Sequence, residues 1–171
     1  MTGQETDWNY WTVVLCKPDA TQRNLVRPIL EWIGSSVAIV ATREVVVTSQ
    51  QILAHYADML EVQHRFPFNV HAELIDHYVG STVTVALGRG ETADTAQRVR
   101  DLLGHYDPAV AQPITIRGYY GIDNAEKAAA EGRFIRNLVH SSDNLKDAEA
   151  DFKIWFGEPY RHLLSQEART R

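Results

Sequence analysis

The segment from residue 132 to residue 156 constrains this chain more than any other, because it combines a buried strand, a histidine and a capped helix. Leu138 and Val139 predict a short buried strand, and His140 comes at its end. Residues 141–144 are small and polar, and they predict a turn into the next helix. A histidine fixed between a buried strand and a helix start is well placed to act chemically.

The helix that follows carries an acid at the edge of its apolar face. Asn144 is the expected N-cap, with Asp147 at N3 as the reciprocal acid. The positions expected to face the core are Leu145, Ala148, Phe152, Trp155 and Phe156. Asp151 borders this face, and a buried acid is costly unless it has a partner.

Two interpretations of the histidine remain open at this point. In one, Asp151 holds one ring nitrogen of His140 and leaves the other free to attack. In the other, His140 is a turn or core residue, which is the more common fate of a single histidine after a buried strand.

Length and composition limit the class of protein. With 171 residues, of which 44% are hydrophobic, we expect one domain over residues 1–171, with loose ends at 1–9 and 165–171. The net charge of −5 argues against a nucleic-acid partner bound through a general basic field, so we expect a small-molecule partner. Cys16, the single cysteine, excludes an internal disulfide and suits a reducing compartment. No apolar run approaches the roughly 20 residues that span a bilayer, so we expect a cytoplasmic protein without membrane contact.

The order of elements predicts an α/β protein of the α+β type. Helices are expected near residues 27–33, 49–60, 69–78, 91–104, 124–132 and 144–156, and strands at 10–16, 37–48, 81–87 and 138–139. Apart from the pair of helices between residues 49 and 78, this order gives two β-α-β halves. We therefore expect a ferredoxin-like antiparallel sheet with helices on one face.

Two loops offer side chains that suit a ligand. Lys17 stands where the first strand ends at Pro18, a usual place to present a side chain, although a solvated lysine is the plainer interpretation. Phe66 and Phe68 flank Pro67, and they form either a packed corner or a platform for a flat ring.

Three motifs in order resemble those of the nucleoside diphosphate kinase family. They are Lys17-Pro18-Asp19, Thr115-Ile116-Arg117-Gly118, and the pattern R-N-x-x-H-x-S-D over residues 136–143. The resemblance extends from about residue 10 to residue 160. It implies the ferredoxin-like sandwich and the transfer of a γ-phosphoryl group from a nucleoside triphosphate to a nucleoside diphosphate through a phosphohistidine. It also implies a homo-oligomer, and Mg²⁺ that arrives on the nucleotide phosphates.

The resemblance assigns the chemistry to a few positions. His140 matches the nucleophile, and Ser142 and Asp151 match the hydroxyl and the acid that support it. Tyr56 matches a tyrosine close to the transferred phosphate.

Other positions match the residues that bind the nucleotide. Lys17, Arg100 and Arg117 match the phosphate-binding cations. Arg100 is preferred to Arg98 because it stands four residues before Gly104, as in the family pattern R-x-x-x-G. The resemblance places the ribose hydroxyl on Asn137 and the base on Phe68. Tyr106, two residues after Gly104, stands at a nucleotide-binding position.

The chain departs from the family pattern at several of these positions. Asp151 replaces the usual glutamate, Tyr106 replaces a threonine that touches phosphate, and Ser141 replaces a glycine. The spacer between Arg117 and Asn137 is longer than usual. These departures indicate a divergent branch, and they leave as an alternative a nucleotide-binding or scaffolding protein with weak catalysis.

Overall fold

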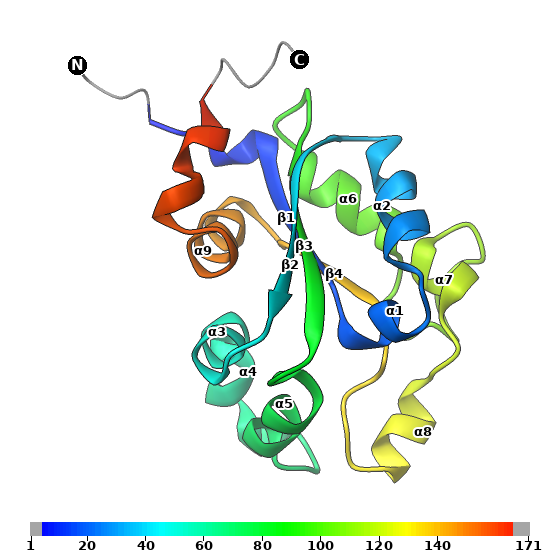
Figure 1. The fold of residues 1–171 in the computed structure, drawn as a ribbon. Coiled ribbons are helices and arrows are strands. Elements are labelled where there is room, and N and C mark those ends of the chain that lie inside the picture. The colour runs from blue at the N-terminus through cyan, green and yellow to red at the C-terminus, as the bar shows by residue number, and fades with distance from the viewer. Residues whose placement is uncertain (1–4, 166–171) are drawn as a thin grey trace.

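One antiparallel sheet of four strands forms the centre of the molecule, in a computed structural model that describes residues 5–165 (Figure 1). The strand order is β2-β3-β1-β4, and the strands are β1 (Trp11–Cys16), β2 (Ala38–Val46), β3 (Thr82–Arg89) and β4 (Val139–Ser141). This arrangement confirms the ferredoxin-like α+β fold. The central strand β1 pairs with β3 on one side and with β4 on the other.

Helices cover both faces of the sheet (Figure 1). The α-helices are α1 (Pro18–Gln22), α2 (Val26–Gly34), α3 (Ser49–His55), α4 (Ala57–Glu61), α5 (Val70–Tyr78), α6 (Thr95–Leu103), α7 (Ile116–Tyr120), α8 (Ala125–Ala130) and α9 (Leu145–Trp155). Short 3-10 helices are η1 (Trp8–Tyr10), η2 (Gln63–Arg65) and η3 (Glu158–Leu164). No helix within residues 5–165 is long and apolar enough to cross a bilayer.

The expectation that helices lie on one face of the sheet was wrong. Every residue of β1 is buried, so both faces of this strand need a cover. Val13 and Leu15 point into a core that α3, α5 and α9 complete, whereas Val14 and Cys16 point into a second core under α2 and α6. Strand β1 is therefore held by packing on both faces of the sheet.

Helix α9 begins as its sequence predicts but packs slightly differently. The Asn144 side chain accepts from the backbone N–H groups of Lys146 and Asp147, as an N-cap should. The carboxylate of Asp147 accepts a hydrogen bond from the side-chain amide of Asn144 at 2.9 Å, and not from its backbone N–H. Leu145, expected in the core, is the first residue of the helix and is 43% exposed.

Several boundaries differ from the expected ones. Pro18 occupies the first turn of α1, so the first strand meets a helix and not a loop. Helix α3 is capped by Thr48, whose side chain accepts from the N–H of Gln51, and not by Ser49. Helix α6 begins only at Thr95, four residues later than expected.

The segment just before the first strand is more ordered than the sequence suggests. Trp8 lies in η1 and its ring packs against Phe152 at 5.6 Å, so the start is fixed earlier than residue 10. Residues 1–4 and 166–171, expected to be loose, lie outside the described residues.

Candidate active site

The pairing of β1 with β4 brings two sequence motifs together. His140 lies opposite Leu15, and the N–H of Lys17 donates to the carbonyl oxygen of Leu138 at 2.8 Å. The histidine and the lysine, more than a hundred residues apart in sequence, therefore stand at the same end of the sheet. The His140 side chain is 25% exposed, so its ring is both held and reachable.

One ring nitrogen of His140 faces a carboxylate. Nε2 lies 3.8 Å from Oδ2 of Asp151, and the same oxygen accepts a hydrogen bond from Oγ of Ser142 at 2.8 Å. Oγ of Ser142 also accepts from the backbone N–H of Val13 at 3.1 Å, which ties it to β1. Burial opposes the charge of Asp151, but contacts with His140 and His55 prevail and hold the pKa of this acid well below its usual range.

The His140 ring itself is uncharged at neutral pH. Burial lowers its pKa to about 4, and the nearby His55 and Lys17 act in the same direction, although Asp151 opposes them. A neutral imidazole keeps a lone pair on one nitrogen. With Nε2 directed at Asp151, the nitrogen available for attack is Nδ1.

Lys17 and Asn137 are linked at the edge of the site. Nζ of Lys17 donates to Oδ1 of Asn137 at 2.7 Å, and Nδ2 of Asn137 donates to the carbonyl oxygen of Tyr106 at 2.8 Å. Burial and the charge of Arg117 lower the pKa of Lys17 to about 7. The Tyr106 ring is 61% exposed, and its centroid lies 4.3 Å from that of His105. Tyr106 thus meets Asn137 through its main chain.

Arg117 joins the end of α6 to the strand of the histidine. Its Nη1 donates to the carbonyl oxygen of Gly104 at 3.0 Å and its Nη2 to that of Val139 at 2.6 Å. Gly104 has a φ of +82°, and a side chain there would overlap Thr115, so this close approach requires glycine. Burial and the neighbouring Arg100 lower the pKa of Arg117 to about 10, which leaves it charged at neutral pH.

A small cavity is bordered by the side chains of Arg100, Arg117 and His140. Its volume is about 30 Å³, and it is lined by Arg100, Leu103, Gly104, Arg117, His140 and Ser141. Arg100 forms an ion pair with Asp143, and both side chains are about half exposed. The alternative cation, Arg98, lies exposed on α6 and does not line the cavity.

Tyr56 lies beside His55, and its hydroxyl is uncharged. Its Oη lies 2.9 Å from Oη of Tyr78, and its ring is edge-on to His55 at 4.7 Å. Burial raises the pKa of Tyr56 to about 12, so the hydroxyl keeps its proton.

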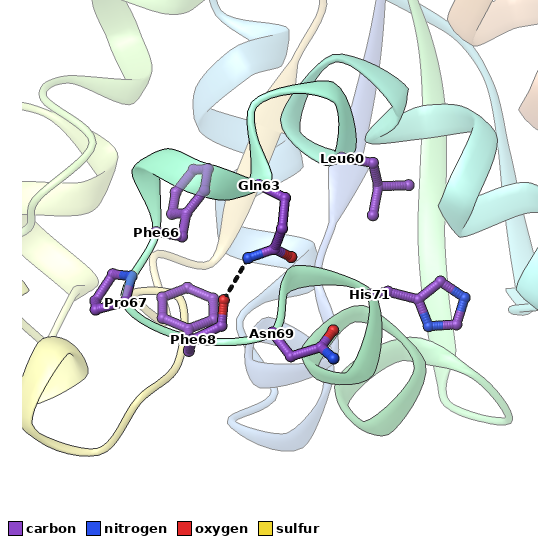
Figure 2. Close-up of a pocket in the computed structure, with 7 residues that line it drawn as sticks. All are labelled: Leu60, Gln63, Phe66, Pro67, Phe68, Asn69 and His71. Atoms are coloured by element: carbon purple, nitrogen blue, oxygen red, sulfur yellow. Dashed lines mark hydrogen bonds between the residues drawn. The ribbon is translucent and has the colours of Figure 1, made fainter.

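The loop with two phenylalanines is both a packed corner and the wall of a cavity. The ring of Phe68 contacts those of Phe66 at 5.6 Å and Phe134 at 4.9 Å. This loop borders an open cavity of about 770 Å³, which is lined by Leu60, Gln63, Phe66, Pro67, Phe68, Asn69 and His71 (Figure 2). Gln63 braces the loop, because its side chain donates to the Phe68 carbonyl oxygen and accepts from the N–H of Val70, both at 2.6 Å.

The donor set that could hold a metal is rich in nitrogen. Within residues 5–165, one group of three such ligand atoms lies close together, from His55, His140 and Asp151, all within 4.8 Å of one another. Mg²⁺ prefers six oxygen ligands, so these residues do not fit it. The described part of the chain therefore offers Mg²⁺ no cage of its own.

Sequence reasoning overlooked Asp19, which is buried beneath the site. Its Oδ2 accepts from the backbone N–H of Leu138 at 2.9 Å. Leu138 has a φ of +74°, a strained conformation for a branched residue, two positions before His140. No pattern in the sequence indicates this contact, because the burial of Asp19 becomes evident only in the fold.

The chain is similar to known proteins over most of its length. The family model described as nucleoside diphosphate kinase matches residues 11–160. A protein of Pyrobaculum aerophilum named nucleoside diphosphate kinase is 29% identical over 175 residues, covering 86% of this chain and 94% of that protein. One of Thermobifida fusca with the same name is 32% identical over 146 residues, covering 85% and 95%.

Solved structures are similar over the same range. A nucleoside-diphosphate kinase of Borrelia burgdorferi, a transition-state mimic with bound vanadate and ADP, gives a TM-score of 0.77 at 27% identity, covering 87% of this chain and 88% of that one. An NDP kinase of Pyrobaculum aerophilum gives a TM-score of 0.74 at 28% identity, covering 88% and 97%.

Proposed function

The chain belongs to the nucleoside diphosphate kinase family and is an enzyme of that family, and we propose that it works through a phosphohistidine on His140. In this proposal a nucleoside triphosphate donates its γ-phosphoryl group to the histidine, and a nucleoside diphosphate then takes it. The observation that supports the proposal most is the meeting of His140 and Arg117 at one cavity, with Lys17 at the same end of the sheet.

The ring geometry suits nucleophilic attack by Nδ1. A bond forms between Nδ1 and the γ-phosphorus while the bond from that phosphorus to the leaving diphosphate oxygen breaks. The proton stays on Nε2, and the charge that grows on the ring is met by Asp151, 3.8 Å away. The second half-reaction is the reverse of the first with a different diphosphate. Ser142 supports the carboxylate in both directions.

Three cations are proposed to hold the phosphates. Lys17, Arg100 and Arg117 surround the site, and positive charge stabilises a phosphoryl group in transfer. The cavity of about 30 Å³ has room for roughly one water, so it must widen to take a triphosphate. In this proposal the phosphates replace Asp143 as the partner of Arg100. Tyr56 is proposed to lie close to the transferred group as a neutral donor.

The remaining nucleotide contacts are proposed from position. Asn137 would bind the ribose hydroxyl with its amide, and Phe68 would stack on the base from the rim of the open cavity. Tyr106 adjoins Asn137 and completes the nucleotide-binding set. Mg²⁺ is proposed to arrive already bound to the phosphates, which agrees with the poor fit of the His-rich donor set.

The proposal also covers the organisation of the protein. We retain one domain over residues 1–171, a homo-oligomer in the cytoplasm, and nucleotides as the small-molecule partners. The absence of a nucleic-acid partner rests on the net charge of −5.

Labelling tests the proposal directly. The protein is incubated with Mg²⁺ and ATP labelled at the γ-phosphate, and an acid-labile label on the protein is expected that added nucleoside diphosphate removes. His140→Ala should abolish the label, whereas His162→Ala, a change at an exposed histidine in η3, should not. A wild-type protein that binds nucleotide but takes no label would support the alternative of a nucleotide-binding or scaffolding protein.

A further inference from the structure

A second imidazole contacts the carboxylate that faces the nucleophile. Nδ1 of His55, at the end of α3, lies 3.0 Å from Oδ1 of Asp151, and the His55 side chain is 1% exposed. Its ring stands edge-on to that of His140, with centroids 4.6 Å apart and planes at 87°. Asp151 is therefore shared by two histidines from different elements.

The hydrogen bonds around His55 define which nitrogen carries its proton. Nδ1 lies between an acceptor, Oδ1 of Asp151 at 3.0 Å, and a donor, Nε1 of Trp155 at 3.2 Å. A neutral imidazole nitrogen satisfies one of these partners and not both. The shorter distance and the negative charge of Asp151 favour a proton on Nδ1 that is donated to the acid.

The other side of the His55 ring does not oppose this tautomer. Nε2 is buried without a hydrogen-bond partner among the described residues. Each tautomer leaves one buried donor unpaired, either Nε2–H of His55 or Nε1–H of Trp155, so the negative charge of Asp151 decides in favour of a proton on Nδ1. His55 is therefore a fixed donor toward Asp151.

Two hydrogen-bond donors, one at each oxygen of Asp151, fix the plane of its carboxylate. His55 holds Oδ1 at 3.0 Å and Ser142 holds Oδ2 at 2.8 Å. With both oxygens held, the carboxylate cannot rotate, and Oδ2 stays directed at Nε2 of His140. Without His55, the short aspartate side chain would be free to turn about its last bond.

We propose that His55 is a positioning residue that orients Asp151 toward the nucleophile His140. The inference rests on the proposed role of His140. Charge grows on the His140 ring only as Nδ1 bonds to phosphorus, so a well-oriented carboxylate stabilises the transition state more than the bound nucleotide. His55 should thus affect the rate of phosphoryl transfer and not nucleotide affinity.

The test compares two substitutions that differ in one donor. An asparagine amide can occupy the place of Nδ1 and donate to Asp151, whereas leucine cannot. His55→Leu should slow single-turnover labelling about tenfold, the effect of losing one charge-assisted hydrogen bond. His55→Asn should keep the rate within about threefold, since it keeps the donor. The dissociation constant for ADP should stay the same in both variants.

The dependence on Asp151 is tested in a double-mutant cycle. In an Asp151→Asn background, His55→Leu should cause little further loss, because there is no carboxylate left to orient. An equal loss in both backgrounds, or a change in ADP affinity in place of the rate, would overturn the proposal. His162→Leu serves as the control for an exposed histidine.

A spectroscopic readout separates this inference from the proposed function. In ¹⁵N NMR of the free protein, the ring nitrogens of His140 should shift in His55→Leu and return toward wild type in His55→Asn. The shift does not require turnover, so it tests the positioning even if wild type takes no phosphoryl label. Unshifted His140 signals in a folded His55→Leu protein would rule the role out.

Discussion

Nε2 of His140 lies 3.8 Å from Oδ2 of Asp151, which is too long for a hydrogen bond but close enough for the carboxylate to stabilise positive charge that develops on the ring. The aspartate side chain reaches from α9 toward β4 but stops short of the ring. Its oxygens are satisfied instead by Ser142 and His55. The acid is thus anchored firmly, while its contact with His140 is long.

We expect Asp151→Glu to speed phosphorylation of His140. The additional methylene should bring an oxygen within hydrogen-bond distance of Nε2, worth about threefold to tenfold in the single-turnover rate. The same methylene enters a well-packed site, so the free energy of unfolding should fall by about 1–3 kcal/mol. Rapid-quench labelling and urea unfolding measure the two effects. A folded variant with an unchanged rate would show that the 3.8 Å gap does not limit transfer.

The pH dependence of labelling should reflect the low pKa of His140. With a pKa of about 4, the ring is mostly neutral at pH 5, so the single-turnover rate should hardly change between pH 7 and pH 5. A histidine with the ordinary pKa near 6.5 would keep only about 3% of its neutral form at pH 5. A fall of that size in a folded protein would contradict the assignment.

The same shift has a consequence for stability. Because the pKa of His140 falls from 6.5 to about 4 on folding, the unfolded chain binds more protons between these pH values. The free energy of unfolding should therefore decrease as the pH falls through this window. His140→Gln should weaken this dependence without removing it, because burial also lowers the pKa of His77 to about 3.

The residues of the candidate site were easier to predict from the sequence than the residues that hold them in place. His140 lies on β4, Ser142 in the turn that follows and Asp151 on the next helix, α9, so local spacing was enough to place them together. His55 on α3 contacts the carboxylate of Asp151, and Asp19 on α1 accepts from the N–H of Leu138. No periodic pattern in the sequence indicates that these distant segments meet. Tertiary pairing decided those contacts.

The prediction that helices lie on only one face of the sheet failed for a related reason. A continuous apolar run such as β1 can have one or both faces covered, and periodicity does not distinguish them. Leu145 illustrates the limit within a helix, because helical spacing predicts the face on which a residue lies but not how deeply it is buried.

Nucleotide affinity should weaken as the pH rises past neutrality. The pKa of Lys17 is about 7 in the free protein, so this cation is progressively lost between pH 6 and pH 8. The dissociation constant for ADP should increase over this range, although the phosphates of ADP become more negative and would act in the opposite sense. Titration calorimetry at several pH values measures it. Lys17→Met should bind more weakly and with little remaining pH dependence, and a pH-dependent loss that persists in Lys17→Met would exclude Lys17 as the cause.

A buried ion pair anchors the segment that leads to Asn137. Asp123 accepts from Nη1 of Arg133 at 2.6 Å and Nη2 at 3.1 Å, and also from the N–H of Arg136 at 2.7 Å. Asp123→Asn should lower the free energy of unfolding by about 3 kcal/mol, because the largely buried Arg133 loses one of its two carboxylate partners and keeps only Glu131. Urea unfolding checks this, with Glu149→Gln in an exposed pair on α9 as a control of far smaller effect.

The acid range gives an independent check on this pair. Burial opposes the charge of Asp123, but the hydrogen bonds from Arg133 and from the backbone lower its pKa to about 2. The stability it contributes is complete above pH 3.8 and is lost as the pH falls toward 2. The free energy of unfolding of Asp123→Asn should change less over this window than that of wild type, and equal slopes would contradict the assignment.

Phe68 offers a test of nucleotide binding that does not involve the phosphates. Its ring is packed against Phe134 at 4.9 Å, yet it also borders the cavity of about 770 Å³. If a base stacks there, Phe68→Ala should raise KM about tenfold for nucleotides of every base, since stacking is worth about 1–3 kcal/mol and reads no base edge. Phe68→Tyr keeps the ring and should keep KM near that of wild type. Steady-state kinetics with several nucleoside diphosphates measure both variants. An unchanged KM in a folded Phe68→Ala protein would leave Phe68 a packing residue of the aromatic corner and place the base elsewhere.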